Sequence, residues 1–136
     1  MKKQLFLILV LALVLRIVGL NWDQGFHLHP DERFLTMVGT SISWPSSLGE
    51  YFDTANSPLN PYNNGFDFFV YGPLPLFLTK LVAGTFGLDN YANLNLVGRL
   101  LSALFDVGTV WLLFKISKKL WPSLFYALMV LPIQLS

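Results

Sequence analysis

Residues 95–121, NLVGRLLSALFDVGTVWLLFKISKKLW, contain a long apolar run that ends in a cluster of lysines. Within positions 96–114, only four residues are polar or charged: Arg99, Ser102, Asp106 and Thr109. A helix needs about 20 mostly apolar residues to cross the hydrocarbon core of a bilayer. The stretch therefore predicts a transmembrane helix over residues 95–119.

The composition of the whole chain also favours a membrane protein. Hydrophobic residues make up 54% and charged residues 12% of the 136 positions, whereas soluble domains carry about 25% charge. The formal net charge of +1 argues against a nucleic-acid partner, because phosphate binding needs a clustered basic face. The chain has no cysteine, which excludes a disulfide framework and thiolate chemistry.

Apolar runs also occur near both ends of the chain. Residues 4–20 are apolar except for Gln4 and Arg16, and a helix of this length reaches about 26 Å. No small-x-small cleavage pattern follows, so we interpret residues 1–20 as an uncleaved first transmembrane helix rather than a secretory signal. Residues 121–136 predict a truncated third transmembrane helix, which indicates an N-terminal fragment of a longer polytopic protein.

Lysines at the ends of these runs predict the orientation. Lys2 and Lys3 precede the first run, and three lysines follow the second, at positions 115, 118 and 119. Cytoplasmic flanks collect lysine and arginine, so we expect a cytoplasmic N-terminus and an extracytoplasmic loop over residues 21–94. That loop holds two cationic side chains and seven carboxylates, a net charge of −5. The expected fold is an all-α, multi-pass protein of the plasma membrane, with two transmembrane helices, a partial third and a long external first loop.

The external loop itself predicts two short juxtamembrane helices. Pro30 suits a first helical turn, and helical spacing of apolar residues extends over about 31–43. Residues 74–88 are too few to span a bilayer and contain Lys80, so we expect a helix at the membrane interface whose lysine reaches the headgroups. Between them, residues 43–69 are rich in Pro, Asn, Ser and Gly, which predicts irregular chain.

The most polar part of the loop is GFHLHPDERF, residues 25–34. Asp31 and Glu32 fall in a predicted first helical turn, where the helix dipole favours carboxylates. One interpretation is capping alone, which stabilises a helix by a few tenths to about 1 kcal/mol. The other is a carboxylate that faces a cavity and takes a proton from an incoming hydroxyl. Adjacent helix positions point about 100° apart, so the two carboxylates should have different roles.

The same stretch contains side chains that could bind a metal ion. Histidine and carboxylate side chains together suit a divalent ion, and His27, His29 and Asp31 alternate along the chain. These ten residues do not complete a tetrahedral or octahedral set. A divalent metal ion is the one cofactor that the sequence suggests, with His27, His29 and Glu32 as its candidate ligands.

Charged residues within the apolar runs need partners. Arg99 and Asp106 lie on one helix face but about 10.5 Å apart along the axis, too far for a direct pair. Arg99 either extends to lipid headgroups or binds a phosphate through both guanidinium nitrogens. We expect Arg16, near its helix end, to extend to the headgroups, and Asp106 to make a structural hydrogen bond within the bundle.

Three segments in order carry a resemblance to a known family: HPDERF at 29–34, VYGPLPLFLTKLVAGTFG at 70–87, and GRLLSALFDVGTVWLLFKISKKLW at 98–121. They resemble the lipid-carrier-dependent glycosyltransferases of the GT-C superfamily, and most closely the protein mannosyltransferase branch, family 39. ALMVLPIQLS, at 127–136, looks like the start of that family's third span. The chain departs from many relatives at Pro73-Leu74-Pro75, where they have adjacent prolines.

The resemblance implies transfer of a sugar from a polyprenyl-phosphate donor to an acceptor outside the membrane. It places the family's acidic motif on Asp31 and Glu32, with Asp31 as the base, and the arginine for the donor phosphate on Arg99. Further candidates for substrate binding are Arg16, His29 and Arg33. Relatives have many more spans, so we expect the fragment alone to be inactive.

Two other functions remain open at this level. The chain also fits a non-catalytic membrane module whose external loop binds a partner or a lipid. It fits equally a small metal-binding membrane protein. The sugar, the acceptor and the oligomeric state are not readable from the residues.

Overall fold

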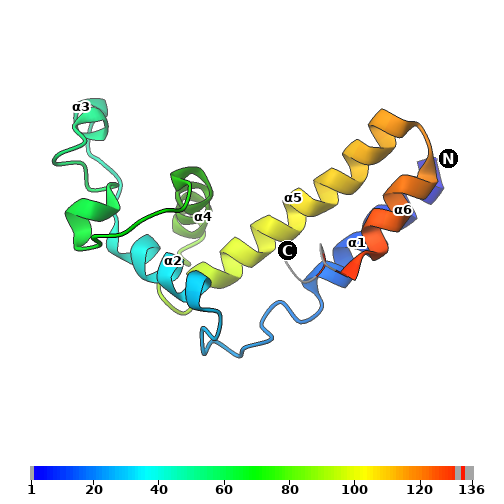
Figure 1. Cartoon of the computed structure of the whole chain (residues 1–136), viewed down its shortest axis with the longest axis horizontal. Coiled ribbons are helices and arrows are strands. Elements are labelled where there is room, and N and C mark those ends of the chain that lie inside the picture. The colour runs from blue at the N-terminus through cyan, green and yellow to red at the C-terminus, as the bar shows by residue number, and fades with distance from the viewer. Residues whose placement is uncertain (1, 131–132, 134–136) are drawn as a thin grey trace. The chain divides into compact units, whose positions relative to one another are not determined.

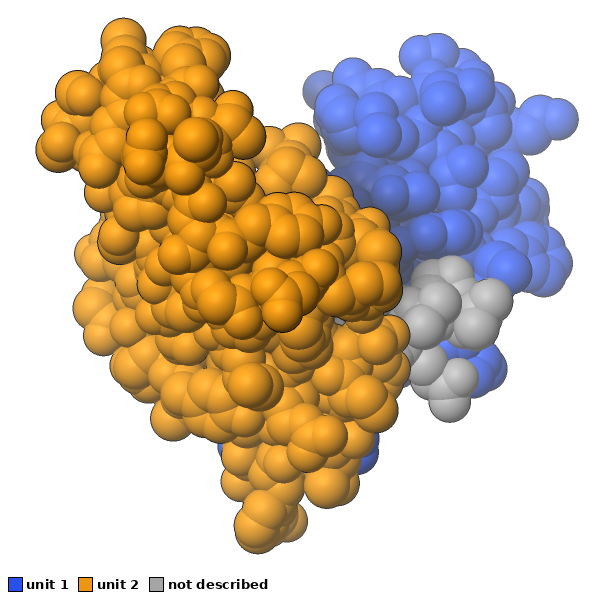
Figure 2. All heavy atoms as spheres, turned by 60° about the vertical axis from the view of Figure 1, so that its left-hand side comes forward, with its two compact units in different colours: residues 1–22, 99–136 blue, residues 23–98 orange. Residues whose placement is uncertain are grey.

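The computed structural model describes residues 2–130 and 133, and within them the chain forms six α-helices, one 3₁₀ helix and no strand. The chain divides into two compact units, as Figure 2 shows. Residues 1–22 and 99–136 form the first, here named the bundle unit. Residues 23–98 form the second, here named the loop unit.

The bundle unit is built from three apolar helices. They are α1 (Lys2–Ile17), the part of α5 (Leu94–Ser117) from residue 99 onward, and α6 (Leu120–Leu128). Their buried cluster consists of Ile8, Ala12, Val110 and Ala127. Because the two alanines are fully buried and small, α1 and α6 lie side by side (Figure 1), a close approach typical of helices in membranes.

The prediction of two transmembrane helices and a partial third is wrong. Within the described residues, only α5 is long and apolar enough to cross a membrane. α1 has 16 residues and reaches about 24 Å, short of the roughly 30 Å hydrocarbon core. It stops at Ile17 because the chain turns away at Gly19, whose φ of +84° is left-handed. Counting apolar residues over 4–20 missed this turn.

The expected third span is also shorter than its apolar run. α6 has nine residues and ends at Leu128, where Met129 adopts an extended backbone. Of the predicted range 121–136, residues 131, 132 and 134–136 lie outside the described part of the chain. What the structure does describe is a short helix packed on α1.

The loop unit contains α2 (Pro30–Ser41), α3 (Leu48–Phe52), the 3₁₀ helix η1 (Pro61–Asn64), α4 (Pro73–Thr85) and the first residues of α5. α2 contacts both α4 and η1. Its core combines buried aliphatic residues with phenylalanines packed around them: Val38, Ile42, Leu59 and Leu76, with Phe34, Phe66, Phe69 and Phe77. This core packs the C-terminal half of α2 against α4 and the chain that leads into it.

Two short elements lie where irregular chain was predicted. In α3, the hydroxyl of Ser47 accepts a hydrogen bond from the N–H of Glu50 at 3.2 Å. The Glu50 carboxylate reaches back to the Ser46 hydroxyl at 2.7 Å and the Ser46 N–H at 2.5 Å. These bonds, the hydroxyl first, lower the pKa of Glu50. In η1, the Asn60 side chain accepts from the N–H of Tyr62 at 3.2 Å.

A close approach at Gly39 supports the packing of α2. A Cβ added there would lie 2.4 Å from Leu94 Cδ2 and 3.1 Å from Leu76 Cδ1. Both leucines are buried, so neither can move aside without disturbing the core. Overpacking of this kind costs about 1–3 kcal/mol.

We therefore expect Gly39→Ala to lower the free energy of unfolding of the loop unit by about 1–3 kcal/mol, measured by denaturant titration in detergent micelles. Gly84→Ala is the matched control, because Gly84 also lies in a helix but a Cβ there would meet nothing within 4 Å. The control should be neutral or stabilising by up to about 1 kcal/mol. Equal effects of the two substitutions would contradict the packing described here.

Candidate functional site

The N-terminal end of α2 presents the carboxylates singled out from the sequence. His29 is the N-cap residue, with extended backbone, and its Nδ1 accepts a hydrogen bond from the N–H of Glu32 at 3.4 Å. Pro30 occupies the first helical position, and Asp31 and Glu32 follow in the first turn. The start of α2 is thus capped by a histidine nitrogen rather than by a carboxylate.

Asp31 is exposed. The pKa of Tyr71 is raised, with hydrogen bonding to Asp31 as the largest cause, followed by burial and by the negative charge of Asp31. The neutral phenol is therefore the favoured form. The neutral phenol stabilises the folded state at neutral pH and up to about pH 10. This stabilisation is lost as the pH rises through the raised pKa of Tyr71.

Aromatic side chains surround the Tyr71 ring. Its centroid lies 6.0 Å from that of Phe34 and 5.9 Å from that of Phe69. Phe34 also meets Phe66 edge to face, with centroids 5.7 Å apart. We name Phe34, Phe66, Phe69 and Tyr71 the aromatic cluster. It joins α2 to the segment before α4.

The neighbours of Asp31 have different surroundings. Glu32 is half-buried, and its carbonyl accepts a hydrogen bond from the Thr36 hydroxyl at 2.8 Å. Arg33 is exposed, and its N–H donates to the carbonyl of His29 at 3.0 Å, as part of the helix start.

His27 lies apart from the cap. It is 3% exposed, has a left-handed φ of +50°, and packs its ring 4.3 Å from that of Tyr91. Neither of its nitrogens has a hydrogen-bond partner among the described residues. His29 points Nδ1 into the helix cap instead. Across residues 2–130 and 133, no three His, Asp or Glu side chains gather as a metal-binding group.

Arg99 and Arg16 belong to the bundle unit. Nη1 of Arg99 donates to the carbonyl of Leu20 at 2.7 Å, and its guanidinium lies 5.5 Å from the centre of the Trp22 ring. The guanidinium is thus fixed at the start of the long apolar part of α5.

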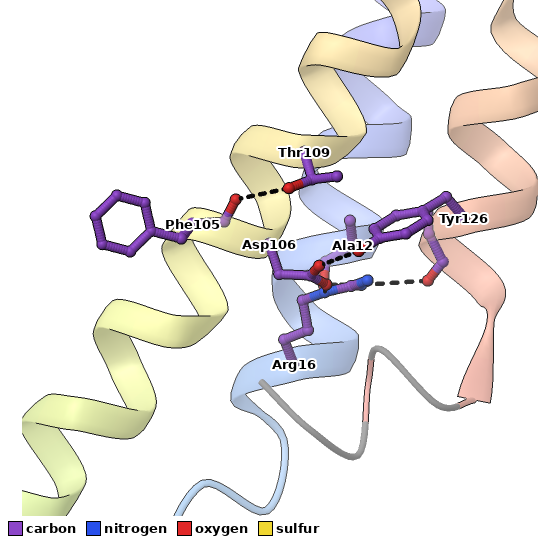
Figure 3. Close-up of polar contacts among 7 residues, drawn as sticks. Ala12, Arg16, Phe105, Asp106, Thr109 and Tyr126 are labelled. Atoms are coloured by element: carbon purple, nitrogen blue, oxygen red, sulfur yellow. Dashed lines mark hydrogen bonds and ion pairs between the residues drawn. The ribbon is translucent and has the colours of Figure 1, made fainter. Parts of the chain in front are cut away.

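Arg16 does not extend to the headgroups, as the sequence had suggested. It is 3% exposed, and Figure 3 shows its Nε paired with the carboxylate of Asp106. Its Nη1 donates to the carbonyls of Ala12 at 3.1 Å and Ala127 at 3.3 Å. The hydroxyl of Tyr126 donates to the other Asp106 oxygen at 2.5 Å. These residues form a polar network that connects α1, α5 and α6.

Lys80 is likewise inside the protein rather than at a headgroup. It is 4% exposed, and its Nζ donates to the Gly39 carbonyl and to Oδ2 of Asp89, both at 2.9 Å. The predicted position was wrong because α2 packs on α4 and covers this face. Lys80 therefore ties α4 to α2 through the same glycine whose small size allows their contact.

The sequence pointed to Asp31 but gave no sign of Tyr71, because no local pattern links residues forty positions apart. No family model, no curated protein and no solved structure matches the chain. The function proposed below is therefore argued from the residues of this chain.

Proposed function

We propose that this chain belongs to an integral membrane glycosyltransferase that moves a sugar from a polyprenyl-phosphate donor to an acceptor on the extracytoplasmic side. The observation that carries the proposal is Asp31, an exposed carboxylate in the first turn of α2. An exposed carboxylate is accessible to an incoming hydroxyl and can accept its proton as a general base.

A bilayer location is supported by the surface of the bundle unit. α5 has 24 residues, and only 17% of its apolar window is buried inside the protein, whereas the core helix of a soluble protein would be mostly buried. Large apolar side chains are exposed on all three helices, among them Phe6, Leu7, Phe105, Ile116 and Phe125. A continuous apolar exterior of this kind suits contact with lipid.

The proposed orientation follows from the charges beyond α5. Three lysines lie in and just after its last turn, at positions 115, 118 and 119. Positive charge collects on the cytoplasmic side of a span, so the chain that precedes α5, with Asp31, lies on the extracytoplasmic side. The resemblance to the lipid-carrier-dependent glycosyltransferases implies that the donor is a lipid-linked sugar.

The proposed chemistry is a single displacement at the sugar. The acceptor oxygen forms a bond to the anomeric carbon while the bond from that carbon to the phosphate oxygen breaks. The acceptor proton passes to Asp31, and polyprenyl phosphate leaves with the bonding electrons as a phosphate anion. The family resemblance assigns the donor phosphate to Arg99, and guanidinium groups stabilise negative charge that develops on phosphate oxygens.

The direct test uses the protein as its gene encodes it, reconstituted in lipid nanodiscs with polyprenyl-phosphate-mannose as the donor. We expect release of polyprenyl phosphate in the presence of a membrane extract that supplies acceptors. GDP-mannose is the matched control donor and should not be consumed. Turnover of the nucleotide sugar alone, or of neither donor, would contradict the proposal.

A non-catalytic module that binds a partner through the loop unit is the second candidate. The exposed apolar side chains of α3 favour it, because Leu48 is 78% and Phe52 is 75% exposed. If this function holds, the double substitution Leu48→Ser and Phe52→Ser abolishes partner capture while Asp31→Asn has no effect. The opposite pattern supports the glycosyltransferase.

A further inference from the structure

The two faces of α4 have a polarity opposite to that of a surface helix in water. Its buried residues are Leu76, Lys80 and Ala83, which share one face at helical spacing. Lys80 is the one charged residue of this helix, and it lies on the buried face. A surface helix in water shows the reverse arrangement, because its charged side chains stay in solvent while its apolar face packs on the core.

The outward face of α4 carries leucines. Leu74 is 76% and Leu81 is 50% exposed, and the half-buried Leu78 lies between them on the same face. We name Leu74, Leu78 and Leu81 the leucine stripe. Over residues 68–88, the sequence contains no charged residue other than Lys80. No charge therefore interrupts the surface on which the leucine stripe lies.

The inward charge of α4 is paired within the loop unit. Nζ of Lys80 donates to Oδ2 of Asp89 and to the Gly39 carbonyl, both at 2.9 Å. Charged side chains at membrane depth face the protein interior and pair with opposite charges or with backbone carbonyls, because lipid does not solvate them. Lys80 has partners of both kinds. A helix with its charge turned inward and its leucines turned outward therefore fits a lipid environment.

The same helix approaches the start of α5. A Cβ added at Gly98 would lie 3.6 Å from Cγ2 and 3.8 Å from Oγ1 of Thr79, so α4 and the first turns of α5 are close neighbours. Both residues belong to the loop unit. Among the described residues, α5 is the helix that is long and apolar enough to cross a membrane. α4 therefore lies near the level at which this span enters the bilayer.

We propose that the leucine stripe of α4 inserts among lipid acyl chains, in the leaflet at the N-terminal end of α5. The loop unit is then bound to the bilayer through α4 as well as connected to it through α5. Removal of the leucines from water drives this contact, as it does for amphipathic helices that lie in a membrane interface. The inference rests on the proposed bilayer location of α5 and is independent of sugar transfer.

The experiment measures the surroundings of a nitroxide spin label at position 81. The sequence contains no cysteine, so Leu81→Cys in the full chain gives a single labelling site. The protein is placed in phosphatidylcholine nanodiscs. EPR power saturation compares collisions of the label with O₂, which concentrates in hydrocarbon, and with a water-soluble Ni(II) complex.

We expect the ratio of O₂ to nickel collisions at Leu81→Cys to be severalfold higher than at Thr54→Cys. Thr54 is the matched control, because it is an exposed residue of the same unit that lies outside α4. Leu74→Cys is a second site on the leucine stripe and should give the same high ratio. Its side chain is 76% exposed, so the substitution leaves the core of the loop unit intact.

Phe105→Cys separates this inference from the location of α5. Phe105 lies on α5 and is 65% exposed, so its label should also favour O₂. If nickel reaches the Phe105 label, α5 is outside the bilayer, and the proposed location and this inference both fail. If the Phe105 label is in lipid but nickel reaches the labels at Leu74 and Leu81, this inference alone is overturned. Labels on the leucine stripe that neither reagent reaches would show that a second copy or another protein covers it, which also overturns the inference.

Discussion

Replacing Asp106 with asparagine is expected to lower the free energy of unfolding of the bundle unit by about 3–5 kcal/mol. The reason is the Arg16 guanidinium, which is 3% exposed and would keep its charge without a counter-ion. Tyr126 would also lose the anionic acceptor of its hydroxyl. Unfolding by denaturing detergent, followed by the fluorescence of Trp111 and Trp121, measures the loss.

Two further variants show whether the buried charge causes this loss. The double substitution Arg16→Leu and Asp106→Leu removes both charges and should recover most of the stability, because apolar residues pack well in place of a buried pair. Thr109→Val is the local control. The Thr109 hydroxyl bonds only the Phe105 carbonyl of its own helix, at 3.2 Å, so we expect a change below about 0.5 kcal/mol. A small effect of Asp106→Asn would contradict the network.

The start of α2 was accessible from the sequence. Pro30 fixes the backbone suited to a first turn and keeps His29 extended, and the helix begins at Pro30.

The helix α3 was not predicted, although the sequence contains a signal for it. Ser47 and Glu50 have the spacing of a capping box, in which each side chain satisfies backbone N–H groups at the helix start. The prediction of irregular chain over residues 43–69 relied on their composition and overlooked this local pattern.

The predicted number of transmembrane helices was wrong for a different reason. The apolar run over 4–20 gives the hydropathy of a spanning helix, but helix length depends on backbone conformation as well. The left-handed Gly19 ends the helical part early, and apolar composition does not register such a turn. Only α5, which has no such interruption before its lysines, keeps its full length among the helices described.

Asp106 was expected to make a structural hydrogen bond within the bundle, and it does, but the identities of the partners of the charged residues could not be predicted. Arg16 and Asp106 are 90 residues apart, and Lys80 and the Gly39 carbonyl are 41 apart. Periodicity places a residue on one face of its own helix but does not say which helix covers that face. For the same reason, Tyr71 was interpreted only as part of a motif, and its packing against Phe34 became visible in the folded chain.

The second large effect concerns the proposed reaction. Asp31→Asn removes the base while keeping the shape of the side chain. We expect kcat for sugar transfer to fall by about 10²–10⁴-fold, the usual contribution of a general base, with the fold intact. Glu32→Gln should have a smaller effect, because Glu32 points about 100° away from Asp31 around the helix.

The measurement that bears most directly on this proposal compares two proteins in the same nanodiscs, the wild type and Asp31→Asn, at matched folded amounts by circular dichroism. The rate of polyprenyl phosphate release from polyprenyl-phosphate-mannose is followed, with Asp67→Asn as the control carboxylate. We expect release by the wild type and by Asp67→Asn, and at least about a hundredfold slower release by Asp31→Asn. Release by Asp31→Asn at the wild-type rate would contradict the assignment of Asp31 as the base.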